Sequence, residues 1–106
     1  MKFETITIDQ QDAVWLITLD RQDRLNAINQ TMLSEIETAC DLIEADCSCR
    51  AVVLTGAGRA FSPGFDLQDQ ATNTPIGIEE WRPILQRDFD GVIRFWNLKK
   101  PTIAAV

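Results

Sequence analysis

The chain has 106 residues, of which 45% are hydrophobic and 25% are charged, as is typical of one small globular domain with its own core. The net charge is −6 and no basic stripe is present, which argues against a nucleic-acid partner. No apolar run approaches the length of a membrane span, and the N-terminus lacks a signal-peptide core. We therefore expect no membrane partner and a cytoplasmic location.

The content of histidine and cysteine excludes several kinds of site. Histidine is absent, which removes the commonest general base and the usual serine or cysteine triad. The three cysteines, Cys40, Cys47 and Cys49, are odd in number and lack a framework spacing, so a disulfide scaffold is not expected. Cys47 and Cys49 have no fourth metal ligand in view, and we expect no metal site.

In chain order, the first elements predicted are two strands joined as a hairpin. Phe3–Ile8 and Ala13–Leu19 are rich in Thr, Ile, Val and Trp, and the polar segment Asp9–Asp12 separates them as a turn. A polar loop that carries Arg21 and Arg24 follows.

A helix over about residues 30–46 comes next. Asn29 is a good N-cap, and apolar residues recur at helical spacing at Met32, Leu33, Ile36, Cys40 and Ile43. The acidic residues Glu35, Glu37 and Glu44 fall on the outer face, where we expect them to be solvated rather than catalytic. Because strands precede and follow this helix, the pattern predicts a right-handed crossover between parallel strands.

The segment from Arg50 to Leu67 predicts a strand, a glycine turn and a second turn that opens a helix. Ala51–Thr55 is a short β-branched run typical of a strand covered on both faces. Ser62-Pro63-Gly64-Phe65 fits a type II turn, with the positive φ at Gly64. The backbone N–H of Phe65 would then point into a cleft, where it would attract negative charge. On the local pattern alone, an ordinary strand–loop–helix connection remains the alternative.

The last third of the chain predicts a loop over residues 70–77, a second amphipathic helix near 79–97 and a buried strand at Thr102–Val106. Pro83 should lie in the first turn of that helix. The apolar stripe of this helix fits a core or subunit-packing face better than a ligand site; it comprises Trp81, Leu85, Phe89, Val92 and Trp96. An apolar strand needs a covering element, so we expect this sequence to be the front part of a longer protein.

Three segments in this order resemble the enoyl-CoA hydratase/isomerase (crotonase) superfamily: Trp15–Asn29, Ala51–Leu67 and Lys100–Val106. The resemblance covers nearly the whole chain. It implies an α/β fold of crotonase-like ββα spiral units, incomplete at the C-terminus, in which residues 1–106 form the N-terminal part of one domain.

The resemblance also implies a site. The backbone N–H of Phe65 would be one half of an oxyanion hole that stabilises an enolate-like species formed from an acyl-CoA thioester. The second donor and the acid/base carboxylates of the family lie beyond Val106, so we expect the 106 residues alone to be inactive. Arg24 matches a position near the CoA phosphates, and Arg21 is expected to be either a second phosphate contact or a solvated loop arginine. The residues that would contact CoA are Arg24, Ala27, Pro63, Phe65, Asp66 and Leu67.

The activity implied is that of a lyase or isomerase of the kind found in fatty acid metabolism, with coenzyme A as part of the substrate and no separate cofactor. A homo-oligomer, trimer or hexamer, or association with the missing C-terminal part is implied as well. Family members often have alanine at the positions of Pro63 and Phe65. The phenylalanine side chain would line the acyl pocket, which argues against the simplest crotonyl substrate.

Two other functions stay open at this point. One is a non-catalytic CoA-binding or assembly module. The other is a nucleotide-binding domain, but the spacing of Gly56, Gly58 and Gly64 does not match the Gly-x-Gly-x-x-Gly pattern.

Overall fold

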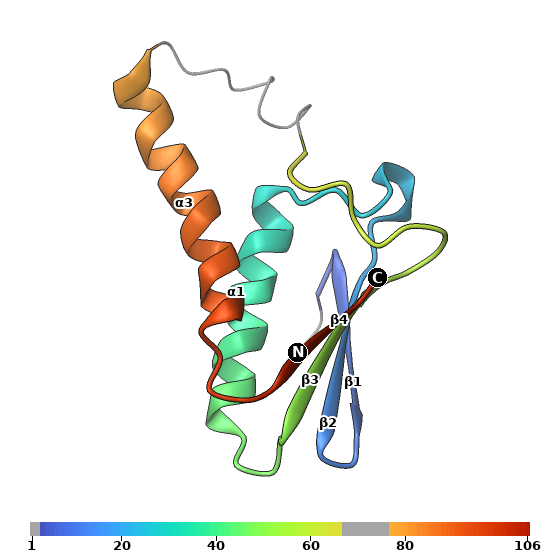
Figure 1. Ribbon diagram of the computed structural model, residues 1–106. Helices are drawn as coiled ribbons and strands as arrows, with labels where there is room; N and C mark the ends of the chain where they lie inside the picture. The colour runs from blue at the N-terminus through green and yellow to red at the C-terminus, as the bar shows by residue number, and fades with distance from the viewer. Residues whose placement is uncertain (1–2, 67–76) are drawn as a thin grey trace.

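The computed structural model describes residues 3–66 and 77–106. In chain order the elements are β1 (Ile6–Gln11), β2 (Val14–Leu19), the 3-10 helix η1 (Gln22–Arg24), α1 (Gln30–Ala45), β3 (Ala51–Gly56), α3 (Ile78–Trp96) and β4 (Thr102–Ala105) (Figure 1). The four strands form one sheet in the order β1-β2-β3-β4. β1 pairs antiparallel with β2, whereas β2 with β3 and β3 with β4 are parallel. The parallel pairing predicted across the first helix is therefore confirmed.

The hairpin forms as predicted, but its turn is shorter. Gln11 pairs with Val14, so the loop consists of Asp12 and Ala13 only, and Asp12 takes a positive φ of 54°. The prediction of a four-residue turn over Asp9–Asp12 was wrong. β1 is an edge strand with exposed polar residues, and its backbone pairs with β2 regardless of their polarity.

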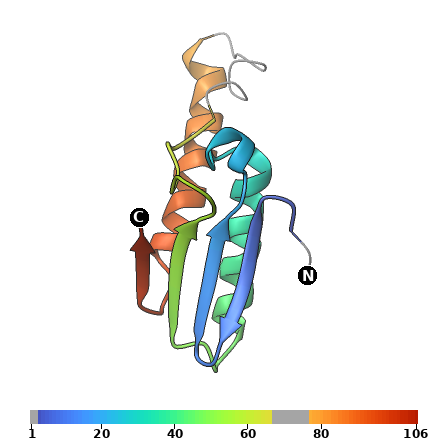
Figure 2. The ribbon, with the colours of Figure 1, turned by 90° about the vertical axis from the view of Figure 1, so that its right-hand side faces the viewer.

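The core lies between one face of the sheet and α1 (Figure 2). In β2, Trp15, Ile17 and Leu19 alternate with more exposed residues and point toward the helix. α1 contributes Ala39 and all of the predicted apolar positions except Leu33, which packs against α3 instead. Asn29 is the N-cap, and its side chain accepts a hydrogen bond from the N–H of Met32 at 2.9 Å.

The opposite face of the sheet is not covered by any element in the part of the chain that the structure describes (Figure 2). In β3 only Val52 is buried, and all of β4 is exposed. The register places Leu16, Val53 and Ile103 in one row across this open face. The predictions of a strand covered on both faces and of a buried strand at Thr102–Val106 were therefore wrong for this chain, because helices lie on one side only.

The second helix begins at Ile78, so Pro83 is its sixth residue rather than a member of its first turn. The prediction that Pro83 lies in the first turn was wrong. At this position proline removes the N–H that would donate to the carbonyl of Glu79. Pro83 is exposed, so water can reach the carbonyl that loses its partner.

α3 packs on α1 through small and charged residues. Gly91 lies against Leu33 so closely that a Cβ on the glycine would be 2.4 Å from Leu33 Cδ1. Arg87 forms an ion pair with Glu37 at 2.8 Å. These contacts fix which face of α3 meets α1, and they turn the predicted apolar stripe outward.

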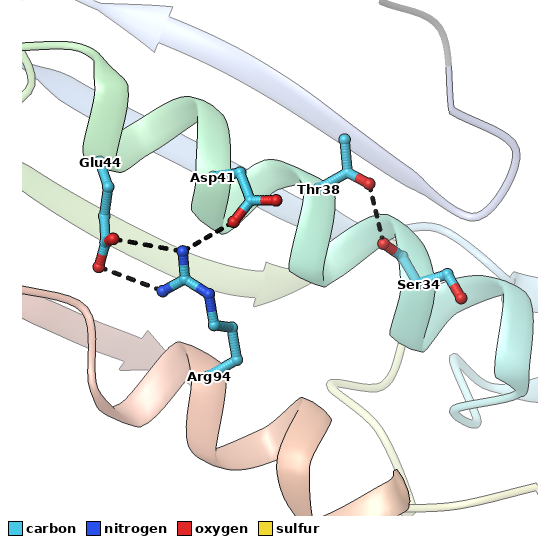
Figure 3. A network of polar contacts seen from close by, with 5 residues as sticks. All are labelled: Ser34, Thr38, Asp41, Glu44 and Arg94. Carbon is cyan, nitrogen blue, oxygen red and sulfur yellow. Dashed lines mark hydrogen bonds and ion pairs between the residues drawn. The ribbon is translucent and has the colours of Figure 1, made fainter.

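Arg94 of α3 makes a second set of ion pairs with α1 (Figure 3). Its guanidinium reaches Asp41 at 2.8 Å and Glu44 at 3.1 Å. Cys40 of α1 is fully buried beside this cluster, and burial raises the pKa of its thiol to about 11.

The acidic residues of α1 do more than face solvent. Glu44 is exposed, as predicted, whereas Glu35 and Glu37 are only half-exposed. Glu37 and Glu44 pair with the arginines of α3. Glu35 accepts hydrogen bonds from the N–H groups of Glu4, at 2.6 Å, and Thr5, at 2.8 Å, and from the Thr5 hydroxyl. Each carboxylate thus joins α1 to a neighbouring segment.

Candidate functional site

The candidate site lies at the edge of the sheet where the parallel strands β2 and β3 end. The loop after β2, residues 20–29, and the segment after β3, residues 57–66, meet there. Ala57 N–H donates to the carbonyl of Leu19 at 2.7 Å and holds the start of the second segment against the end of β2. The carboxyl edge of parallel strands is where α/β sheets place their ligands.

Phe65 is held in this edge by a parallel bridge to Ile28. The N–H of Ile28 donates to Gly64 O, and the N–H of Asp66 donates to Ile28 O, both at 2.8 Å. In a parallel bridge the residue between two such bonds turns its own N–H and C=O to the opposite side. Among residues 3–66 and 77–106, no hydrogen bond uses the Phe65 N–H. The bridge thus leaves a fixed backbone donor that faces away from Ile28.

The turn before Phe65 has the positive φ predicted for it. Gly64 has φ 104°, and an added Cβ would meet nothing within 4 Å. This glycine is therefore required by its backbone conformation and not by lack of space. The Gly64 N–H donates to Ser62 Oγ at 3.1 Å. The helix start predicted after Asp66, including Leu67, lies outside the described residues.

A residue that sequence reasoning missed, Asn26, connects the two segments. Its side chain is fully buried, and it accepts a hydrogen bond from Arg21 N–H at 2.8 Å. Its amide nitrogen donates to the carbonyls of Ala57, at 2.9 Å, and Ala60, at 2.8 Å. Leu25 and Asn26 have positive φ values of 53° and 66°, and asparagine tolerates that region better than most residues. The available signal in the sequence was a polar residue between two apolar ones, Leu25 and Ala27.

Arg21 and Asp66 form a second tie between the same segments. The ion pair measures 2.9 Å, and the exposed fraction of the two side chains is only 17% and 8%. Arg21 also donates to the carbonyl of Ala27 at 2.7 Å. Arg21 thus holds the loop together within the chain, whereas the sequence suggested a solvated arginine or a phosphate contact.

A cavity of about 300 Å³ lies between η1 and the segment after β3. It is lined by Gln22, Leu25, Ala57, Arg59 and Ala60. The exposed Arg59 brings positive charge to this space, and sequence reasoning did not single it out. A second hollow of about 400 Å³ is lined, among the described residues, by side chains of α3.

The other predicted site residues differ in exposure. Arg24 is exposed on η1, and Pro63 is exposed in the turn. Ala27 is buried, with its carbonyl bonded to Arg21. Phe65 and Asp66 lie together at the bridge to Ile28.

Neither a metal cluster nor a membrane-spanning helix occurs in the described part of the chain. Within residues 3–66 and 77–106 no three cysteine, aspartate or glutamate side chains gather as metal ligands. Over the same ranges, neither helix combines the length and hydropathy that crossing a bilayer requires.

Comparison with known proteins places the chain in a family. The family model for enoyl-CoA hydratase/isomerase matches residues 9–106. A probable enoyl-CoA hydratase of Rhizobium meliloti is 34% identical over 106 residues, which cover all of this chain and 39% of that protein. The 1,2-epoxyphenylacetyl-CoA isomerase of Escherichia coli is 32% identical over 104 residues, or 97% of this chain and 40% of that protein.

The crystal structure of an enoyl-CoA hydratase/isomerase from Xanthobacter autotrophicus Py2 is similar with a TM-score of 0.94 and 50% sequence identity, over 99% of this chain and 39% of that one. The chain thus spans about two fifths of the length of the proteins it matches. Its fold is that of the N-terminal part of these relatives. The chain belongs to the enoyl-CoA hydratase/isomerase family.

Proposed function

We propose that this chain supplies one half of the oxyanion hole of a CoA-thioester enzyme, in which the Phe65 N–H stabilises an enolate-like intermediate. The observation that carries the proposal is the direction of that N–H. The bridge to Ile28 fixes it, and no described residue accepts its hydrogen bond. A preorganised donor of this kind stabilises charge that develops on a thioester carbonyl, because it need not reorient during the reaction.

CoA carries several phosphate charges, so the proposed site needs local positive charge despite the acidic chain. Arg21 is occupied by Asp66 and Ala27. The family resemblance implies that Arg24 makes the phosphate contact, and we add Arg59, which is exposed at the neighbouring cavity, as a second cation. In this assignment the remaining CoA contacts are made by Ala27, Pro63, Phe65, Asp66 and Leu67.

The Phe65 N–H is tested by removing it without removing the side chain. The experiment uses the complete native protein. Replacing the peptide bond between Gly64 and Phe65 by an ester removes the N–H, and we expect it to lower kcat with an enoyl-CoA by about 10²–10³-fold. Phe65→Pro removes the same N–H by ordinary mutagenesis. Phe65→Ala keeps the N–H and should mainly change the preferred acyl chain. Equal losses in the ester and alanine variants, with folding intact, would assign the role to the side chain and reject the proposal.

The phosphate contact is tested by calorimetry with CoA. We expect Arg24→Ala to weaken binding at low ionic strength, and the difference from the unsubstituted protein to shrink in high salt, because salt screens charge contacts. Arg82→Ala, an exposed arginine on α3 away from the loops, is the matched control and should leave binding unchanged. Unchanged affinity of Arg24→Ala at low salt would exclude Arg24 as a phosphate ligand.

A non-catalytic binding or assembly module is the second candidate, and the exposed apolar stripe of α3 favours it. Leu85, Phe89 and Trp96 are 55%, 59% and 78% exposed, as expected of a face that another polypeptide covers.

An enoyl-CoA assay separates the two candidates. We expect the 106 residues alone to lack turnover, since a single oxyanion donor supplies only about 3–4 kcal/mol of transition-state stabilisation. Robust turnover by these residues as a monomer would contradict that expectation, whereas a native protein that binds CoA without turnover would favour the module.

A further inference from the structure

The inference concerns Asn26, which the fold buries completely although its side chain is polar. Both hydrogens of the side-chain amide nitrogen are used, one on Ala57 O and one on Ala60 O. The side-chain oxygen accepts from Arg21 N–H. Replacing a buried amide with this many partners is costly, because each partner that loses its hydrogen bond stays buried and has no water to replace it.

The two hydrogen bonds that Asn26 donates fall on one short part of the chain, residues 57–60, which connects β3 to the turn before Phe65. The backbone turns back sharply here, since a Cβ on Gly56 would lie 2.4 Å from Ala60 O and 2.5 Å from Phe61 O. Two carbonyls that point to the inside of this bend need donors. Asn26 provides them, and it therefore determines where the chain leaves the bend.

The other end of the same segment is held two residues further along the first loop. Ile28 bonds to Gly64 O and to Asp66 N–H, and so fixes the backbone on both sides of Phe65. Asn26 and Ile28 thus hold residues 57–66 at both ends from one stretch of three residues. A shift of the bend at Asn26 would displace the adjoining bridge between Ile28 and residues 64–66, and with it the direction of the Phe65 N–H.

We propose that Asn26 is a positioning residue that aims the Phe65 N–H at the thioester oxygen; this rests on the proposed function. The described side-chain hydrogen bonds of Asn26 go to Arg21, Ala57 and Ala60, which all lie in the two loops. Its contacts join two loops, whereas the core joins the sheet to the helix. Loss of Asn26 should therefore impair orientation of the donor more than folding of the core.

Asn26→Asp tests the proposal in the native protein with a minimal change of shape. An ionised aspartate cannot donate to Ala57 and Ala60, and its charge faces their carbonyls. We expect kcat with an enoyl-CoA to fall by about 10–100-fold, less than for loss of the donor itself, while KM changes by less than about threefold. At lower pH the carboxyl becomes protonated and regains one donor, so kcat relative to the unsubstituted protein should partly recover.

Asn29→Asp is the matched control, three residues away on the same segment. The Asn29 side chain only accepts a hydrogen bond, from Met32 N–H, and an aspartate can do the same. We expect it to leave kcat unchanged. A nuclear magnetic resonance measurement of the Phe65 amide complements the assay: its chemical shift and hydrogen exchange should change in Asn26→Asp and not in Asn29→Asp, while the α1 amides stay protected in both.

The outcomes separate this proposal from the proposed function. A lower kcat with a changed Phe65 signal and a protected α1 supports it. An unchanged Phe65 signal overturns it, as does a loss of activity that parallels loss of protection throughout α1. If the unsubstituted protein does not turn over enoyl-CoA, the proposed function fails, and the Phe65 signal alone still decides whether Asn26 positions that amide.

Discussion

The two long helices have similar amphipathic patterns and opposite surroundings. Met32 and Ile43 of α1 are completely buried against the sheet, whereas Phe89 and Trp96 of α3 are 59% and 78% exposed. The difference arises because α3 meets α1 through Gly91 and charged residues instead of through its apolar stripe. An amphipathic helix must have its apolar face covered, but the pattern does not say whether its own chain provides the cover.

The largest expected effect is on the buried face of α1. Ile43→Ala should lower the free energy of unfolding by about 2–5 kcal/mol, since it removes buried methyl groups and leaves a cavity. Leu42→Ala is the control on the next residue, which is 37% exposed, and should cost much less. Urea unfolding followed by circular dichroism measures both. Similar losses at the two positions would mean that α1 does not carry the core in the way described.

An intermediate effect is expected where the helices touch. Gly91→Ala places a methyl group 2.4 Å from Leu33 Cδ1, and Leu33 is 1% exposed and has little room to move. Overpacking should outweigh the better helix propensity of alanine and leave a net loss of about 1 kcal/mol.

Combining this change with Leu33→Ala, which provides space, should make Gly91→Ala neutral or stabilising in a double-mutant cycle of unfolding free energies. Additive effects of the two changes would show that Gly91 and Leu33 are not packed together. The orientation of the stripe would then need another cause.

The smallest effect on folding is expected at the exposed stripe of α3. Phe89→Ser together with Trp96→Ser should change the free energy of unfolding by less than about 0.5 kcal/mol per site, because both side chains are mostly exposed. If another polypeptide covers the stripe, the same pair of changes should lower the mass in solution of the native protein. Sedimentation measures this, with Arg82→Ser as a control on the same helix. A large loss of folding stability would instead indicate that the stripe packs inside the chain.

The outer face of the sheet, like the stripe of α3, is apolar and has no cover among the described residues. Ala51–Thr55 and Thr102–Val106 have the composition of strands buried on both sides, yet Leu16, Val53 and Ile103 form a row without a described cover. Apolar content predicted both strands correctly, and the strand–helix–strand order predicted the parallel pairing of β2 with β3. Apolar content did not tell which of the two faces α1 would occupy, because both faces carry apolar side chains.

One part of the candidate site, the turn at Gly64, was predictable because it depends only on neighbouring residues. The φ of Gly64 follows from a turn of four residues, and no distant contact is needed to predict it. Asn26, by contrast, bonds to carbonyls 31 and 34 residues away. No local pattern reveals such partners. The same reason explains why the sequence predicted solvent or phosphate around Arg21: its partner Asp66 reaches it only after the chain has folded.

The sequence by itself therefore determined the type and order of the elements, the capped first helix, the turn at Gly64 and the family. These properties depend on periodicity and short motifs, which act over a few neighbouring residues. Only the tertiary structure decided that Asn26, Arg21 and Asp66 join the two loops, that the Phe65 N–H turns away from Ile28, and that the stripe of α3 faces outward. Those features depend on which distant segments come into contact, and local sequence patterns do not specify such contacts.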